Sequence, residues 1–448
     1  MSPEIVSIVA LVVMFVIATF LPVNMGALAF VAAFAVGTLS LGMSTDDIIA
    51  GFPADLFLTL VGVTYLFAIA QNNGTVDLLV RGAVRAVAGR IALIPWVMFT
   101  ITGILTAIGA LGPAAVAIIA PIALGFAARY RISALLMGMM VIHGAQAGGF
   151  SPISVYGVTV NGVVEKGGLD VPPMAVFLSS LLFNLAIGVG LFLVLGGREL
   201  LSRRADVEPD DIPASSSGAT PVGTAPSGAG VATATRSEVS SKTGTSGGAT
   251  RTQIATIVGL VALAVLSLAF DLDVGFVAIT IAVILALLSP QQQKGALGQV
   301  SWSTVMLIGG VLTYVAVLQE AGTVKYVGNG VAGIGVPLLA ALLLCYIGGV
   351  VSAFASSTAI LGVTIPLAVP FLSAGEVSAT GLVCAIAISS TIVDVSPFST
   401  NGALVLANAQ GVDRDVFYKQ ILKYSALVVA VGPLLAWAVL VLLPGIAG

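Results

Sequence analysis

Two hydrophobic segments of this chain are interrupted, at matching places, by residues that a membrane-spanning helix normally avoids. Residues 148–154 read Gly-Gly-Phe-Ser-Pro-Ile-Ser, and residues 393–399 read Val-Asp-Val-Ser-Pro-Phe-Ser. Proline removes a backbone donor and glycine relaxes the backbone, so both disfavour a continuous helix. A helix broken at membrane depth is tolerated only where its freed backbone groups are buried in protein or line a cavity. The pair therefore predicts two broken helices in a chain with two related halves.

Other residues repeat in the same order and support a duplication. Pro121 precedes the first Ser-Pro by the spacing that separates Pro366 from the second. The stretch from Gly62 to Val76 likewise matches the stretch from Gly310 to Val324, at a slightly different offset. We therefore expect an internal repeat in which one half carries a small insertion.

The composition indicates an integral membrane protein. Hydrophobic residues make up 58% of the chain and charged residues 8%, whereas soluble domains carry about a quarter charged residues. No basic patch suggests a nucleic-acid partner. Cys345 and Cys384 both lie in apolar segments and are expected to be buried thiols. The N-terminus contains Glu4 and no basic region, so the first apolar run is predicted to be a span rather than a cleaved signal.

Ten apolar segments are long enough to cross a bilayer. They cover residues 4–21, 24–43, 54–72, 133–163, 173–196, 253–270, 274–290, 302–320, 378–409 and 418–443. Two further apolar stretches, 91–128 and 336–372, are interrupted near their middles at 109–113 and 352–358. We interpret each as a helical hairpin that enters and leaves on one side. The alternative is that each stretch crosses the membrane twice.

The distribution of basic residues favours re-entrant hairpins. With five crossings per half and a cytoplasmic linker, 15 of the 17 basic residues lie inside, and only Lys166 and Lys325 lie outside. Both termini are then extracytoplasmic. The expected fold is an all-α integral membrane protein with two inverted repeats of five transmembrane helices, each with a re-entrant hairpin and a broken helix. The repeats cover 1–198 and 253–448.

Residues 199–252 differ from the rest of the chain because Ser, Gly, Ala, Thr and Pro dominate. No apolar period runs through them, so we predict a disordered cytoplasmic linker between the repeats. A passive tether is favoured over a regulatory segment.

The chemistry of the four interruptions is that of a transporter rather than an enzyme. The sequence contains no metal-ligand cluster, no nucleophile paired with a base and no phosphate loop. Helix N-termini meeting at the midplane would offer free N–H groups to a carboxylate, while unwound carbonyls and hydroxyls can coordinate a small cation. No basic residue lies in the core of a predicted span. These features favour an anion transporter with cations bound alongside the substrate.

The arrangement resembles the ion transporter superfamily, in particular the divalent-anion:sodium symporters, and the first half is most similar to MatC-type dicarboxylate (malonate) carriers. In the symporters each hairpin tip carries Ser-Asn-Thr a few residues before a proline. The second tip here reads Ser356-Ser357-Thr358 before Pro366, while the first tip reads Leu111-Gly112-Pro113 and lacks those oxygens. The resemblance implies a homodimer with a scaffold domain and a transport domain that moves as an elevator. It also favours sodium over protons as the coupling ion.

The candidate site residues come from the four interruptions. Substrate contacts are expected from Gly149, Ser151, Pro152, Ser154, Ser357, Thr358, Ser396, Pro397, Ser399 and Thr400. Cation contacts are expected from Gly112, Gly148, Ser356, Asp394 and Asn401. Each hydroxyl has an ordinary alternative, in helix packing or as a cap of the following half-helix. Asp394 is an intramembrane carboxylate that could bind a cation, carry a proton or pair with freed N–H groups. For His143, the only histidine, a structural imidazole is favoured over a proton site.

The sequence thus predicts a secondary active transporter of the cell membrane. It would take up a small dicarboxylate such as malonate or succinate together with sodium or a proton, with no other cofactor. The main alternative is a cation/proton antiporter of the same superfamily in which Asp394 titrates. A passive anion channel is a third possibility, although a channel does not need matched hairpins and breaks.

Overall fold

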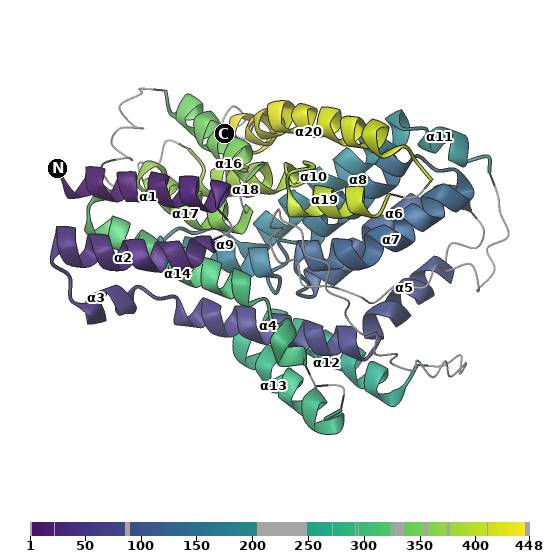
Figure 1. Ribbon diagram of the computed structural model, residues 1–448, viewed down its shortest axis with the longest axis horizontal. Helices are drawn as coiled ribbons and strands as arrows, with labels where there is room; N and C mark the ends of the chain where they lie inside the picture. Colours follow the sequence, from purple (N-terminus) through teal and green to yellow (C-terminus); the bar gives the residue numbers. More distant parts are fainter. Residues whose placement is uncertain are drawn as a thin grey trace, which may run out of the picture.

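The computed structural model describes residues 2–21, 23–85, 90–203, 249–270, 272–291, 293, 295–323, 326, 336–353, 357–373, 377–409 and 411–443. This part of the chain is built from helices (Figure 1). Those of the first half are α1 (Pro3–Phe20), α2 (Met25–Leu41), α3 (Thr45–Ala50), α4 (Ala54–Asn72), α5 (Thr75–Arg85), α6 (Ile94–Ala107), α7 (Gly112–Tyr130), α8 (Ala134–Gly148), α9 (Val155–Lys166), α10 (Pro173–Val194) and α11 (Gly197–Leu200). Those of the second half are α12 (Arg251–Ala269), α13 (Val274–Leu288), α14 (Trp302–Glu320), α16 (Pro337–Ser352), α17 (Ser357–Ser373), α18 (Ala379–Ile392), α19 (Thr400–Ala407) and α20 (Arg414–Trp437).

The helix bounds agree closely with the predicted spans. α4 and α14 have the bounds expected from the sequence, and both expected broken helices are interrupted, between α8 and α9 and between α18 and α19. Six of the described helices are long and apolar enough to cross a membrane, and they are α4, α7, α10, α12, α14 and α20 with its extension to Leu442. The protein is therefore a multi-pass membrane protein. The re-entrant course of the hairpins and the sidedness of the termini stay predictions, and most of the expected linker, residues 204–248, lies outside the described part.

Equivalent helices of the two halves begin with equivalent caps. Asn24 caps α2 through a hydrogen bond from the Gly26 N–H (2.9 Å), and Asp273 caps α13 through one from the Phe276 N–H (2.8 Å). Ser133 and Ser378 cap α8 and α18 in the same way. A polar side chain that accepts a bond from the first turn satisfies a donor that the helix leaves free. The sequence repeat thus produces matching local structure.

In two helix pairs, a helix of the first half packs against a helix of the second half. α2 packs against α14, and α4 packs against α13. Glycines allow the close approach, since a Cβ added at Gly26 would lie 1.9 Å from the Met306 carbonyl oxygen and one at Gly62 would lie 2.8 Å from the Gly275 carbonyl oxygen. Small residues of this kind are typical of helix contacts in membranes. Helices α1, α2 and α14 share a small apolar core, to which Ile48 of α3 and Val363 of α17 also contribute.

The remaining helices form a larger assembly around the interruptions. α8 packs against α6, α7 and α10, and α18 packs against α16, α17 and α20. α10 also contacts α18, so the assembly joins the two halves. In Figure 1, α6, α7 and α8 lie toward the right, whereas α1, α2 and α3 lie at the left, and α16 and α20 lie along the upper edge.

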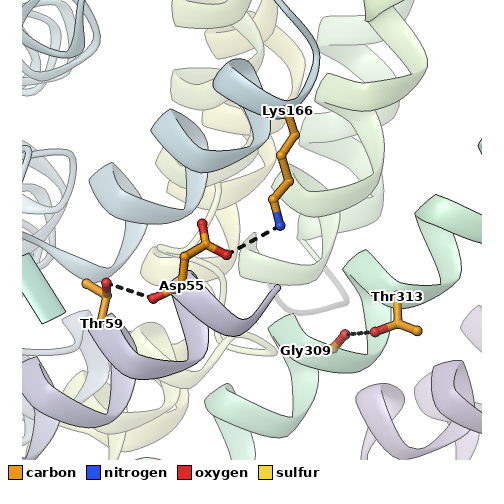
Figure 2. A network of polar contacts seen from close by, with 5 residues as sticks. All are labelled: Asp55, Thr59, Lys166, Gly309 and Thr313. Carbon is orange, nitrogen blue, oxygen red and sulfur yellow. Dashed lines mark hydrogen bonds and ion pairs between the residues drawn. The ribbon is translucent and has the colours of Figure 1, made fainter. Parts of the chain in front are cut away.

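The α4–α13 pair shares an apolar core with this assembly, and one ion pair also links them (Figure 2). The Lys166 ammonium at the end of α9 lies 3.5 Å from the Asp55 carboxylate at the start of α4, and the two side chains are 45% and 57% exposed. Exposed pairs of this kind contribute little because solvent screens them and both side chains lose entropy.

We expect Lys166→Met to lower the stability of the protein only slightly. The loss should be about 1 kcal/mol or less, which is a fall of about 2 °C or less in the thermal midpoint of a chain this long. The measurement is thermal unfolding of purified protein at low and at high sodium chloride. The difference from wild type should vanish at high salt, and a large, salt-independent difference would show that Lys166 has another role.

Candidate functional site

The two breaks have the same hydrogen-bonded geometry. In the first, the Ser154 hydroxyl lies 2.5 Å from the Gly149 carbonyl oxygen and 2.7 Å from that of Ser151, and it accepts a bond from the Gly157 N–H (3.2 Å). In the second, the Ser399 hydroxyl lies 2.7 Å from the carbonyl oxygens of both Asp394 and Ser396, and it accepts a bond from the Gly402 N–H (3.3 Å). Each residue of the second set follows its counterpart by 245 positions. The repeated Ser-Pro-x-Ser therefore encodes one loop structure, made twice.

Ser154 and Ser399 have their hydroxyls engaged inside these loops. Each is the N-cap of the helix that follows, α9 or α19, and each also closes the loop onto the carbonyls behind it. This is the capping role that the sequence left open beside substrate contact. The N–H groups that these two hydroxyls satisfy are not free to bind an anion.

Two glycines permit the tight return of the chain after each break. A Cβ added at Gly157 would lie 1.9 Å from the Ser151 carbonyl oxygen, and one added at Gly402 would lie 2.0 Å from that of Ser396. Any other residue would have to displace backbone, because real Cβ contacts are not this short. Sequence reasoning did not single out these glycines, although they occupy the same position of the repeat.

The broken helix of each half packs against the hairpin of the other half. α9, which follows the first break, packs against α17 of the second hairpin, and α19, which follows the second break, packs against α7 of the first hairpin. Figure 1 shows α19 beside α7. The site predicted from the four interruptions is therefore shared between the halves.

Equivalent residues make the two crossing contacts. Tyr156 of α9 lies beside the side chains of Ser357 and Thr358 at the start of α17. Asn401 of α19, its counterpart 245 residues later, lies beside the start of α7, where a Cβ added at Gly112 would be 3.7 Å from its amide nitrogen. Sequence reasoning identified Asn401 but missed Tyr156, and the repeat offset is the signal that could have found it.

Asp394 lies between the two crossings, beside Ser357 of the first and Asn401 of the second. Its side chain is 9% exposed. The Asn401 amide nitrogen lies 3.4 Å from one of its carboxylate oxygens, and the hydroxyls of Ser357 and Ser399 are also close. Among the described residues, no lysine or arginine forms an ion pair with it. A buried carboxylate without a cationic side chain needs another source of positive charge or a proton.

Two further features show polar atoms available at this place. The side-chain amide oxygen of Asn401 (Oδ1) is buried and has no hydrogen-bond partner among the described residues. The Ser357 hydroxyl lies 2.9 Å from the Ser352 hydroxyl, which also bonds the Ser390 carbonyl oxygen. The carboxylate, the amide oxygen and the hydroxyl are all ligand types that hard cations prefer.

The first hairpin offers backbone donors instead. α7 begins at Gly112 after Leu111, which provides no side-chain cap, and Pro113 occupies its first turn. The backbone N–H groups of this turn therefore receive no capping bond from Leu111, and the positive end of the helix dipole lies at this point. An uncapped helix start of this kind suits a carboxylate.

The other predicted site residues occupy varied places. Ser151 and Ser396 are buried in their loops, and the Ser396 hydroxyl accepts a bond from the Phe398 N–H (3.2 Å). Gly148 packs against Gly103 of α6, and its carbonyl accepts the Ser151 N–H (3.1 Å). Of the other predicted contacts, Pro397 is buried, Pro152 is half-buried and Thr400 is exposed. Ser356 lies outside the described residues.

His143 forms a separate buried network. Its Nδ1 lies 2.8 Å from the Asn184 amide oxygen, and its Nε2 lies 2.6 Å from the Tyr424 hydroxyl. The Asn184 amide nitrogen donates to the Ser180 carbonyl (2.9 Å), so its oxygen faces the ring and must accept from Nδ1–H. Tyr424 can then donate to Nε2, and the neutral imidazole is satisfied at both nitrogens. This geometry fits the structural role that the sequence favoured. No group of His, Cys, Asp and Glu side chains in the described ranges could hold a metal ion.

Comparisons with known proteins agree with this architecture. Residues 1–149 match the model of a family described as "Dicarboxylate carrier protein MatC N-terminus", so the resemblance inferred from the sequence is confirmed for that region. Among solved structures, the chain resembles the YdaH transporter of Alcanivorax borkumensis with a TM-score of 0.57 and 13% identity. That similarity covers 87% of this chain and 86% of the other, and at this identity it establishes the fold alone. No curated protein sequence matches the chain.

Proposed function

We propose that this protein is a secondary active transporter that takes up a small dicarboxylate, such as malonate or succinate, together with a cation. The match of residues 1–149 to a dicarboxylate carrier family supports the substrate class. The fold shared with a transporter supports carriage over catalysis. The proposed location is the cell membrane, with the linker 199–252 in the cytoplasm and both termini outside.

The observation that carries this proposal is the crossing of breaks and hairpins between the halves. Four helix ends meet where α9 contacts α17 and where α19 contacts α7. Interrupted helices in corresponding positions of two halves are the usual location of a transporter's substrate and ion sites. The uncapped start of α7 offers N–H groups to one carboxylate, and Tyr156, Ser357 and Thr358 offer hydroxyls to the other.

A coupling cation is needed because the site itself is negative. Asp394 is buried between the two crossings, and a dicarboxylate adds like charges nearby. Like charges a few ångströms apart in a medium of low dielectric repel strongly. A cation between Asp394 and the substrate removes this repulsion. Sodium is the favoured ion on resemblance, and a proton on Asp394 is the alternative.

Alternating access is proposed to occur by an elevator movement in a homodimer. The α2–α14 and α4–α13 pairs, which exchange partners between halves through close glycine contacts, would be the fixed scaffold. The assembly of α6–α10 and α16–α20 would move and carry the site with it. The Asp55–Lys166 pair is one contact between the two parts, beside the packing of α14 on α17 and of α4 on α9, and is weak enough to break on each cycle.

The test is uptake of radiolabelled malonate into tight proteoliposomes under an inward sodium gradient, an inward proton gradient or neither. We expect accumulation under the sodium gradient, by up to about tenfold for each tenfold ratio of sodium and each coupled ion, since tenfold corresponds to about 1.4 kcal/mol. Empty liposomes and wild-type vesicles without a gradient are the controls. Absence of accumulation with malonate, succinate and citrate under every gradient would reject the proposal.

One observation favours a second candidate, a cation/proton antiporter. Asp394 is a buried carboxylate whose nearest described partners are neutral groups, so protons and cations could compete for it. The antiporter would exchange protons in liposomes without any organic anion. A pH-sensitive dye inside the vesicles distinguishes the two functions, because the symporter requires the dicarboxylate for its cation movement.

A further inference from the structure

The contact between α16 and α18 contains four polar side chains, which we call the α16–α18 seam. All four are buried, and they are Cys345 and Ser352 of α16 and Ser389 and Ser390 of α18. Cys345 lies beside Ser389, and the Ser352 hydroxyl bonds the Ser390 carbonyl oxygen. The distance from Cys345 to Ser352 along α16 is about 10 Å. The seam is therefore a polar strip inside an otherwise apolar assembly.

Two hydroxyls of this strip have unmet bonding capacity. Those of Ser389 and Ser390 are buried and have no hydrogen-bond partner among the described residues. A buried hydroxyl left in this state costs about 1–3 kcal/mol. A bound water makes about three hydrogen bonds to polar groups of this kind and removes that cost. Water is also the ligand whose chemistry fits, because the seam itself offers neutral hydroxyls and a thiol.

The equivalent contact of the first half, between α6 and α8, is closed by backbone. The counterparts of Ser352, Ser389 and Ser390, 245 residues earlier, have no hydroxyls and are Ala107, Gly144 and Ala145. A Cβ added at Gly144 would lie 2.3 Å from the Phe99 carbonyl oxygen, and one added at Gly148 would lie 1.9 Å from that of Gly103. Neither a side chain nor a water fits between backbones this close.

In the second half a hydroxyl lies between the two helices instead. Gly348 is the counterpart of Gly103, and a Cβ added there would lie 2.6 Å from the Ser390 Oγ. A Cβ added at Gly103 meets the Gly144 carbonyl oxygen at 3.1 Å. Separating α16 from α18 would expose hydroxyls that water can satisfy. Separating α6 from α8 would break close backbone packing and offer water no hydroxyls at these positions, so it costs more.

We infer that the second hairpin opens away from α18 along a water-binding α16–α18 seam, while the first hairpin stays fixed to α8. The seam ends at the hairpin tip, because the Ser352 hydroxyl lies 2.9 Å from that of Ser357. Ser357 begins α17 and lies beside Tyr156, so opening the seam would uncover this end of the candidate site. The inference goes beyond the proposed function, since it assigns the local movement to one hairpin. It rests on that function only where uptake is measured.

The first test uses the two cysteines of the chain as reporters of water. Purified full-length protein in lipid nanodiscs, without any organic anion, reacts with a charged methanethiosulfonate. Cys384→Ala leaves Cys345 in the seam, and Cys345→Ala leaves Cys384, which is also buried but lies beside Ser179 of α10. Each rate is divided by that of the same variant unfolded in detergent. We expect Cys345 to react at least about tenfold faster than Cys384, because a buried thiol reacts only when its surroundings open to water.

A disulfide across the seam tests the movement itself. A Cβ added at Gly348 would lie 3.9 Å from the Ser390 Cβ, within the range of about 3.5–4.5 Å that a disulfide spans. Gly348→Cys with Ser390→Cys, in a chain whose own two cysteines are replaced by alanine, should therefore link α16 to α18 on oxidation. We expect oxidation to lower malonate uptake by about tenfold or more and dithiothreitol to restore it, because a locked gate stops each cycle.

The matched control links two helices that the inference keeps together. A Cβ added at Gly138 of α8 would lie 3.7 Å from the Val405 Cβ of α19. Gly138→Cys with Val405→Cys, in the same cysteine-free background, should crosslink equally well and keep its uptake when oxidised. Equal loss of uptake in both oxidised pairs would assign the effect to crosslinking in general and overturn the inference.

The remaining outcomes separate this inference from the proposed function. Equal thiol rates, a slower Cys345, or full uptake by the oxidised Gly348–Ser390 pair would overturn the opening of the seam, even if malonate is accumulated. A fast Cys345 in a protein that accumulates no dicarboxylate would support the seam and reject the proposed substrate. Where the reduced double variant does not transport, the thiol rates decide.

Discussion

Gly402→Ala is expected to reduce gradient-driven malonate uptake by more than about tenfold, and Gly157→Ala should do the same. An added Cβ would lie 2.0 Å or 1.9 Å from the carbonyl oxygen of Ser396 or Ser151, so the loop must open. Opening it by even about 1 Å moves groups that bind ligand, and misplacement of that size can cost two orders of magnitude in rate. Initial uptake rates in proteoliposomes, normalised to reconstituted protein, measure the effect.

The matched control is Gly190→Ala in α10, where an added Cβ would meet nothing within 4 Å. That variant should retain the wild-type rate, because alanine also favours the helix by up to about 1 kcal/mol over glycine. Normal uptake by Gly157→Ala or Gly402→Ala would mean that the loop geometry is not required for transport. Size-exclusion chromatography before reconstitution separates lost transport from lost folding.

Ser357→Leu should abolish uptake, and Ser357→Ala should chiefly weaken the dependence on the coupling ion. Ser357 is 3% exposed, at the start of α17, beside Asp394 and Tyr156. A leucine would fill the space in front of the carboxylate, and overpacking of this kind typically costs about 1–3 kcal/mol. Alanine leaves the space in front of the carboxylate open but removes one hydroxyl oxygen. The measurement is uptake as a function of sodium concentration for both variants.

Thr364→Val is the control for this experiment. Thr364 lies on the same helix and is also buried, and its hydroxyl donates to the Ile360 carbonyl one turn earlier (2.7 Å). Valine keeps the shape, and we expect an unchanged sodium dependence. Wild-type uptake by Ser357→Leu would show that the tip of the second hairpin is remote from the transport path.

The sequence predicted the helices and the positions of their breaks because those depend on local chemistry. Apolar length determined the bounds of α4 and α14, and Ser-Pro-x-Ser beside glycines located both loops. The interruption of the second span and its intramembrane carboxylate indicated Asp394 and Asn401 as candidate cation contacts, and their side chains lie 3.4 Å apart.

The contacts between the halves could not be predicted in the same way. Which hairpin meets which broken helix depends on packing of segments about 200 residues apart, and no local pattern records it. Tyr156 was missed for this reason, since an aromatic residue in an apolar segment ordinarily indicates lipid or core. The hydroxyls of Ser154 and Ser399 were grouped with substrate ligands because a capping serine and a binding serine have the same sequence signature.

The crossing of α9 with α17 and of α19 with α7 also has a consequence for biosynthesis. A ribosome delivers the first half of the chain to the membrane before α13, α17 and α19 exist. Until they arrive, α4, α7 and α9 lack their permanent neighbours, and the polar backbone of the first loop has only half of its surroundings. Lipid or the insertion machinery must therefore cover these surfaces of the first half during synthesis. The protein reaches its stable state only when its last helices have been inserted.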